Sequence, residues 1–160
     1  MSYKSWVEPA VLLEQQLAPV DQELAELAVK LGIEPAASHV RVLLVARIED
    51  AVSAVTGMRA PRPCTSAQAE LLLSLGHQRD DLTVREADAL IRVAIVQERL
   101  KALGDLQPMR GDVLFFKRGP FPKRAMGPVT VSSIDRFGQV WVERAGGSRM
   151  LPQDLTRSTM

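Results

Sequence analysis

The sequence has little cysteine, histidine and aromatic content: of its 160 residues, one is Cys, two are His and seven are Phe, Trp or Tyr. A single cysteine excludes a disulfide framework and any cysteine-rich metal site. The most apolar segment after the N-terminal region, residues 42–48, contains Arg47 and is far shorter than the ~20 residues that span a bilayer. The first residues lack a basic region followed by an apolar run, so we expect no signal peptide, no membrane contact and a cytoplasmic protein.

Sequence signatures of catalysis are also absent. No glycine-rich phosphate loop follows an expected strand, and neither a Gly-x-Ser-x-Gly nor a His-Glu-x-x-His string occurs. The adjacent carboxylates Glu49-Asp50 and Asp80-Asp81 would point apart on a helix or a loop, so we interpret them as solvated charge or caps. The sequence therefore predicts a protein that is not an enzyme and that uses no cofactor or metal.

The almost neutral total charge hides two different parts. Residues 1–104 hold 11 Lys and Arg against 14 Asp and Glu, a net −3, whereas residues 105–160 hold 9 against 5, a net +4. The first part repeats its apolar residues at helical spacing, and the second alternates short apolar runs with polar residues between glycines. We therefore expect an α+β protein, with an all-α bundle of about five helices over residues 1–104 and a small β-barrel over residues 105–160.

Capping residues and glycines give the helix boundaries in the first part. The predicted helices run over residues 9–18, 21–32, 35–55, 65–76 and 83–103. Thr65 with Gln68, and Thr83 with Glu86, both fit the capping box, in which two side chains satisfy two free backbone amides. We expect Gly104 to end the last helix.

Two segments of the helical part resemble each other. Residues 25–32 (AELAVKLG) align with residues 69–76 (AELLLSLG), and in both copies a glycine stop separates a short helix from a longer one. This repeat indicates a possible duplication of a helical hairpin, in which two hairpins bury their apolar faces against each other.

A second pattern lies in residues 65–91, where Thr-x-x-Gln-x-x-Leu-Leu precedes a Leu-Gly stop and Leu-Thr-x-x-Glu-Ala-x-x-Leu-Ile follows. This pattern resembles a small helical module appended to bacterial and phage proteins, and it supports the helix boundaries rather than any activity.

The second part has the pattern of short strands joined by turns. Alternation predicts strands near residues 112–117, 127–134, 139–144 and 148–151, then a helical-type turn at residues 152–155 and a last short stretch. Trp141 faces away from its two valine neighbours, so it lies either in the barrel core or on a platform that faces a partner.

Several short strings of this part carry a family resemblance. They are GDV at residues 111–113, GPV at 127–129, ID at 134–135 and VWVE at 140–143. Together they resemble the KOW and Tudor-type members of the Src-homology-like small barrels. Such barrels bind nucleic acid in many proteins and protein partners in many others, so the resemblance leaves both functions open.

The loop expected between the first two strands, KRGPFPKR at residues 117–124, concentrates positive charge around one aromatic ring. Its prolines hold it extended and lower the entropy lost on ordering. Its four cations would meet phosphates, while Phe121 would stack on a base or wedge against a sugar. Three arginines on the turns or strand ends of the barrel would extend this surface. The candidate nucleic-acid-binding residues are Lys117, Arg118, Phe121, Lys123, Arg124, Arg136, Arg144 and Arg149.

These observations favour a non-enzymatic accessory protein of a bacterial or phage nucleoprotein assembly. Its basic barrel would bind DNA or RNA through the phosphate backbone, and its helical bundle would dock on a protein partner or on a second copy. The leading alternative is a protein-interaction adaptor, in which the charged loop meets an acidic protein surface. A third interpretation gives the loop no direct role, with Phe121 folded back on the barrel.

Overall fold

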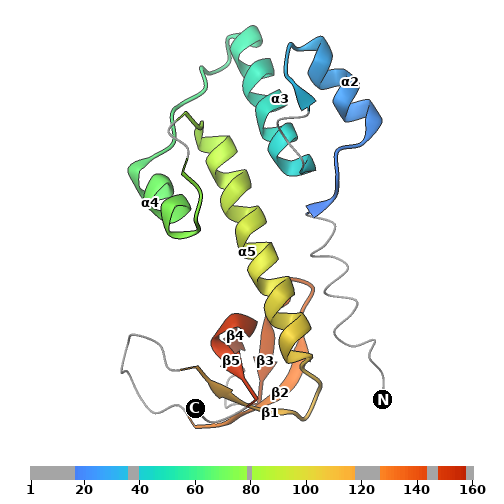
Figure 1. The fold of residues 1–160 in the computed structure, drawn as a ribbon, viewed down its shortest axis with the longest axis vertical. Helices are drawn as coiled ribbons and strands as arrows, with labels where there is room; N and C mark the ends of the chain where they lie inside the picture. Colours follow the sequence, from blue (N-terminus) through green and yellow to red (C-terminus); the bar gives the residue numbers. More distant parts are fainter. Residues whose placement is uncertain (1–16, 36–39, 79–80, 118–126, 144–147, 158–160) are drawn as a thin grey trace. The chain divides into compact units, whose positions relative to one another are not determined.

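The computed structural model describes residues 17–35, 40–78, 81–117, 127–143 and 148–157 (Figure 1). Within them, four α-helices are followed by five strands, which confirms the expected α+β class. About five helices were expected, and most of the first, residues 9–18, lies outside the described residues. The elements are α2 (Gln22–Lys30), α3 (Arg41–Thr56), α4 (Ser66–Ser74), α5 (Val84–Leu106), β1 (Val113–Phe116), β2 (Val129–Ile134), β3 (Val140–Val142), β4 (Ser148–Met150), the 3-10 turn η3 (Pro152–Asp154) and β5 (Leu155–Thr156).

The chain divides into two compact units. One comprises residues 16–95, the helical unit, and the other contains residues 96–160, the sheet unit. Helix α5 is continuous across the division, so its last three turns belong to the sheet unit. No helix in the described part of the chain is both long and apolar enough to cross a bilayer.

Small apolar contacts join the helices of the helical unit. Helices α2 and α3 share a core of Ala28, Leu44 and Ile48. On another side of α3, Leu43 and Ala46 pack against Ala89 of α5. Helix α4 packs on the start of α5 through a third cluster, which comprises Leu72, Leu82 and Ala87. The unit is therefore two helical hairpins, α2–α3 and α4–α5, whose longer helices contact each other.

The polar caps predicted from the sequence are present. Asp21 Oδ1 accepts the amide hydrogen of Leu24 at 2.9 Å, which caps α2. Thr65 and Gln68 make both bonds of the capping box at the start of α4. Thr83 caps α5 in the same way, because its side chain accepts from the amide of residue 86 and its own amide donates to that glutamate.

The two repeated segments end with the same backbone geometry. Gly32 and Gly76 both take the left-handed conformation, with φ of 74° and 82°. In each copy the amide after the glycine donates to a carbonyl five residues back, Ala28 or Leu72, at 2.9 Å. The glycines are required here because an L side chain is strained at positive φ. The sequence repeat thus corresponds to a repeated local structure.

Two predicted helix ends differ from the structure by more than two residues. Helix α3 begins at Arg41 rather than Pro35, after an extended Val40. Gly104 does not end α5, which continues to Leu106, and the chain leaves the helix at Gln107 with φ of 41°. The extra turn places Leu106, 6% exposed, in the core of the sheet. Burying a leucine side chain is worth about 1.5–3 kcal/mol, which exceeds the ~1 kcal/mol cost of a helical glycine.

The sheet is antiparallel throughout, in the order β4-β3-β2-β1-β5. The expected order of strands is confirmed, including the helical turn η3 before the last strand. The predicted barrel is not: β4 and β5 are the edges, and they are not paired with each other in the residues that the structure describes. Closure into a barrel would require these two strands, each of which pairs on one side only, to pair with each other as well. The buried core residues of the sheet unit are Leu106, Leu114, Val129, Val131, Val140, Val142 and Leu155.

Candidate functional site

The structure places three of the eight candidate nucleic-acid-binding residues. Lys117 follows β1, Arg136 lies in the β2–β3 turn and Arg149 lies in β4, and all three are exposed. The amide of Lys117 donates to the carbonyl of Asp154 at 2.8 Å, which fixes the backbone where β1 ends. The five candidates outside the described residues are Arg118, Phe121, Lys123, Arg124 and Arg144.

The strand register places the strand ends next to residues 118–126 and 144–147, the two basic segments, at the same end of the sheet. Val131 of β2 is opposite Val142 of β3, and the amide of Glu143 donates to the carbonyl of Thr130 at 2.8 Å. The start of β2, which follows residues 118–126, therefore lies beside the end of β3, which precedes residues 144–147. Of the nine Lys and Arg in residues 105–160, four lie in these two segments, and the remaining five are matched by five Asp and Glu. The net charge of +4 therefore comes from two segments outside the described residues, and the strand ends next to them lie at one end of the sheet.

Arg136 lies at the opposite end. It occupies the turn between β2 and β3, where Asp135 and Gly138 are joined by a backbone hydrogen bond of 2.9 Å. Its guanidinium carbon is 5.0 Å from the ring centroid of Phe137, which is 49% exposed. The structure therefore does not bring Arg136 together with the strand ends from which the basic segments leave.

An aromatic residue and a cation share the outer face of the sheet. Trp141 is paired with Arg149 of β4 on one side and with Ser133 of β2 on the other. Its neighbours Val140 and Val142 are buried in the core, so the alternation of the strand turns Trp141 to the opposite face. The guanidinium carbon of Arg149 lies 5.4 Å from the centroid of the Trp141 ring. Of the two positions that the sequence left open, the core is therefore excluded, and Trp141 lies partly buried on the outer face, where it and Arg149 form a platform.

Asp135 holds this platform in place. Its Oδ1 accepts the amide hydrogens of Phe137 and Gln139, at 2.9 and 3.0 Å, which closes the β2–β3 turn. Its Oδ2 accepts the indole hydrogen of Trp141 at 3.2 Å. One carboxylate therefore fixes both the turn and the orientation of the indole. The bonds of Asp135 to the turn and to the indole, and the pairing of Trp141 with Arg149, were not predicted from the sequence, although the positions of these residues beside the expected turns carried the signal.

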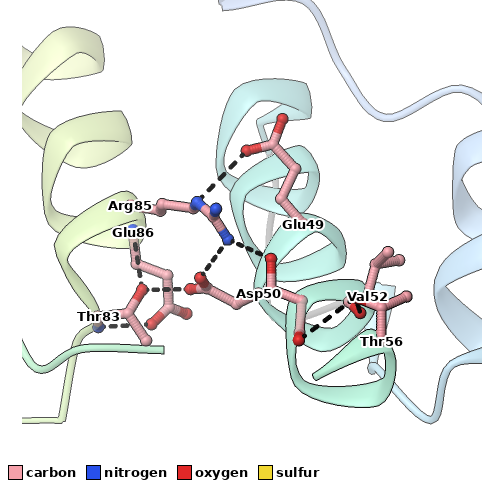
Figure 2. A network of polar contacts seen from close by, with 8 residues as sticks. Glu49, Asp50, Val52, Thr56, Thr83, Arg85 and Glu86 are labelled. Carbon is pink, nitrogen blue, oxygen red and sulfur yellow. Dashed lines mark hydrogen bonds and ion pairs between the residues drawn. The ribbon is translucent and has the colours of Figure 1, made fainter. Parts of the chain in front are cut away.

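A second polar cluster lies in the helical unit, between α3 and the start of α5 (Figure 2). Asp50 is only 8% exposed, and its Oδ1 accepts from Nη1 of Arg85 at 3.0 Å. Its Oδ2 accepts from the hydroxyl of Thr83 at 2.5 Å. The same Arg85 nitrogen donates to Ser53 at 2.9 Å, and Arg85 Nε lies 3.9 Å from Glu49. Asp50 is thus a buried, fully paired carboxylate and not the solvated charge that its sequence position suggested.

The cluster continues through the capping residue of α5. Glu86 accepts the amide hydrogen of Thr83 with one carboxylate oxygen and the Nε hydrogen of Arg47 with the other, at 3.0 and 2.7 Å. The side chains of Arg47 and Glu86 are 19% and 12% exposed, so this ion pair is largely shielded from water. These contacts connect helices α3 and α5 through residues 33–39 positions apart. The cluster is a structural clamp between the two hairpins.

Comparison of the chain with protein-family models, with curated proteins and with solved structures gives no match.

Proposed function

We propose that the sheet unit binds DNA or RNA through phosphate contacts, with little reading of sequence. The main observation in support is that the strand ends next to both basic segments lie at one end of the sheet. Backbone contacts by Lys and Arg supply most of the non-specific affinity for nucleic acid, and aromatic rings add base stacking. Lys117 and the cations of residues 118–126 and 144–147 are the phosphate ligands in this proposal, with Phe121 and Trp141 as stacking residues.

The proposed context is a non-enzymatic, cytoplasmic accessory protein of a bacterial or phage nucleoprotein assembly. The strand order, with a helical turn before the last strand, supports a relationship to the KOW and Tudor-type folds. In this proposal Arg149 acts through its contact with Trp141, and Arg136 makes at most a peripheral contact from the other end of the sheet.

The helical unit is proposed to dock on a protein partner or on a second copy of the chain. Four aliphatic side chains there are more than 60% exposed, and a partner that covered them would remove apolar surface from water. They are Val29, Val55, Met58 and Leu73. A concentration-dependent mass in analytical ultracentrifugation would support the second copy, and a constant monomer mass would favour a different partner.

The salt dependence of binding tests the nucleic-acid proposal. If about four phosphates are neutralised, the affinity for a labelled oligonucleotide should fall with salt with a log–log slope of about −3 to −4. Lys117→Ala with Lys123→Ala should flatten that slope by about two units. The matched control is Lys101→Ala with Arg110→Ala, which removes the same charge from exposed positions of the same unit and should leave the slope almost unchanged.

The adaptor function remains the second candidate, and the same titration separates the two. It is favoured by the apolar residues exposed on the helical unit, which are more suited to a protein than to a nucleic acid. No binding to single- or double-stranded DNA or RNA at low salt would contradict the nucleic-acid proposal. The basic segments would then be expected to meet an acidic protein surface.

A further inference from the structure

A cavity of about 200 Å³ lies beside the clamp between α3 and α5. Its charged lining consists of Arg59, Arg62 and Arg85 with Asp50. Both carboxylate oxygens of Asp50 already accept hydrogen bonds, from Thr83 and Arg85. Asp50 therefore contributes one negative charge to the lining. Three guanidiniums against one carboxylate give the lining a net charge of +2.

Two of these guanidiniums are uncommitted. Arg59 and Arg62 are exposed, and neither side chain has a hydrogen-bond or ion-pair partner among the described residues. Arg85, in contrast, is held by Asp50, Ser53 and Glu49, so its charge is shared between these partners and any ligand in the cavity. The cavity is therefore lined by two exposed arginines without partners, Arg59 and Arg62, and by a third, Arg85, whose side chain is held in place.

The backbone around Arg62 is fixed. Its carbonyl accepts the amide hydrogen of Val84 at 2.9 Å, and two residues later the amide of Cys64 donates to Leu82, also at 2.9 Å. Between these bonds Pro63 and Thr83 form an antiparallel bridge. The segment is thus tied to the first turn of α5, and the positive end of that helix dipole adds to the field in the cavity.

We infer that this arginine-lined cavity binds the phosphate group of a phosphate monoester or of inorganic phosphate. Guanidinium groups match phosphate oxygens with paired N–H donors. A phosphate monoester carries about −1.5 to −2 charge at pH 7, close to the +2 of the lining, whereas a carboxylate or a backbone diester carries about −1. A volume of about 200 Å³ also exceeds the ~30 Å³ share of one water molecule several-fold, so a tetrahedral anion has room. This inference does not rest on the nucleic-acid proposal, since it concerns the helical unit.

The test is a titration of the full chain with inorganic phosphate at about pH 7 and constant ionic strength, followed by amide NMR shifts. We expect saturable shifts at residues 59–62 and 84–85. Arg59→Gln with Arg62→Gln should weaken binding at least about tenfold, because two of three cations are lost. Arg92→Gln is the matched control: it removes an exposed arginine of α5 that does not line this cavity, and it should change the affinity less than about twofold.

Unchanged amide shifts elsewhere in the helical unit, for example at Ala28, will show that the double variant is folded. Two competition arms identify the source of the phosphate. Displacement by a 5′-phosphorylated oligonucleotide but not by the same oligonucleotide without the phosphate assigns the site to a nucleic-acid end, whereas no displacement by either assigns it to a small phosphate compound. Shifts that never saturate, an unweakened double variant, or equal displacement by both oligonucleotides would overturn the inference.

Discussion

Arg149 lies directly across the strand pair from Trp141, with its guanidinium carbon 5.4 Å from the centroid of the indole ring. The indole nitrogen is bonded at the same time to Asp135, so a cation and a carboxylate fix the ring from two directions. A side chain that is already ordered loses less conformational entropy when a ligand binds. This arrangement makes Trp141 a rigid stacking surface on the outer face of the sheet, between the β2–β3 turn and the end of β3.

Trp141→Leu should reduce affinity for single-stranded nucleic acid about 5- to 150-fold, because one base–aromatic stack is worth about 1–3 kcal/mol. The valines on either side of Trp141 form the core, so the sheet should remain folded. Fluorescence anisotropy with a labelled oligonucleotide measures the loss. Phe137→Leu is the matched control, since Phe137 also lies beneath an arginine but is in the turn between β2 and β3. Equal losses in the two variants would contradict a stacking role specific to Trp141.

Substitutions of Asp50 and Arg85, which pair in the clamp between α3 and α5, should lower the free energy of unfolding by unequal amounts. Arg85→Met would leave the carboxylate of Asp50, 8% exposed, with only the hydroxyl of Thr83 as partner, so we expect a loss of about 1–3 kcal/mol in unfolding free energy. Asp50→Asn should cost less, because the Arg85 side chain is 44% exposed and water can solvate its freed guanidinium. Urea unfolding of both variants measures the difference. A larger loss for Asp50→Asn would show that the arginine, not the carboxylate, is the group that depends on the pair.

Asp21 predicts a pH dependence for α2. The amide of Leu24 donates to its carboxylate, and the guanidinium of Arg41 lies 3.1 Å away, so the pKa of Asp21 is below its ordinary value of 3.8. The folded state therefore favours the charged carboxylate, and this stabilisation is complete above pH 3.8 and is lost as the pH falls through the lowered pKa. Asn at this position can still cap the helix but carries no charge.

The thermal midpoint of Asp21→Asn should consequently lie below that of the wild type at neutral pH, and the two midpoints should converge in strong acid. High salt should also narrow the difference, because Arg41 and Asp21 are both about half exposed and their attraction is screened. A difference that stays constant from neutral to acid pH would mean that the hydrogen bond to Leu24, rather than charge, distinguishes aspartate from asparagine here.

Features of the fold that depend on neighbouring residues were predictable from the sequence. The caps at Asp21, Thr65 and Thr83 act over three residues, and the order of strands follows from alternation and turn glycines. These signals are local, so a single sequence carries them. Alternation also separates Trp141 from its two valine neighbours, but the choice between core and outer face needed the burial of those valines in the structure.

Features that depend on distant residues were not predictable. Asp50 is buried because Thr83 and Arg85, more than 30 positions away, supply its hydrogen bonds. Whether the sheet closes depends on pairing between β4 and β5, the two outer strands, and alternation within a strand does not determine which strands pair. Helix α5 passes through Gly104 because Leu106 reaches the core of the sheet. In each case the outcome depends on residues that are distant in the sequence or on a contact outside the element itself.

Gly104 therefore predicts a gain in stability on substitution. It lies within α5, its backbone is not left-handed, and a Cβ placed on it meets nothing within 4 Å. Gly104→Ala should raise the unfolding free energy by about 0.5–1 kcal/mol, because alanine loses less backbone entropy in a helix. Gly57→Ala is the matched control: its site is equally open, but φ is +67°, so the same methyl group should destabilise the protein by about 1 kcal/mol. Chemical unfolding of the two variants tests opposite signs for one substitution, and a loss of stability at Gly104 would mean that α5 ends where the sequence suggested.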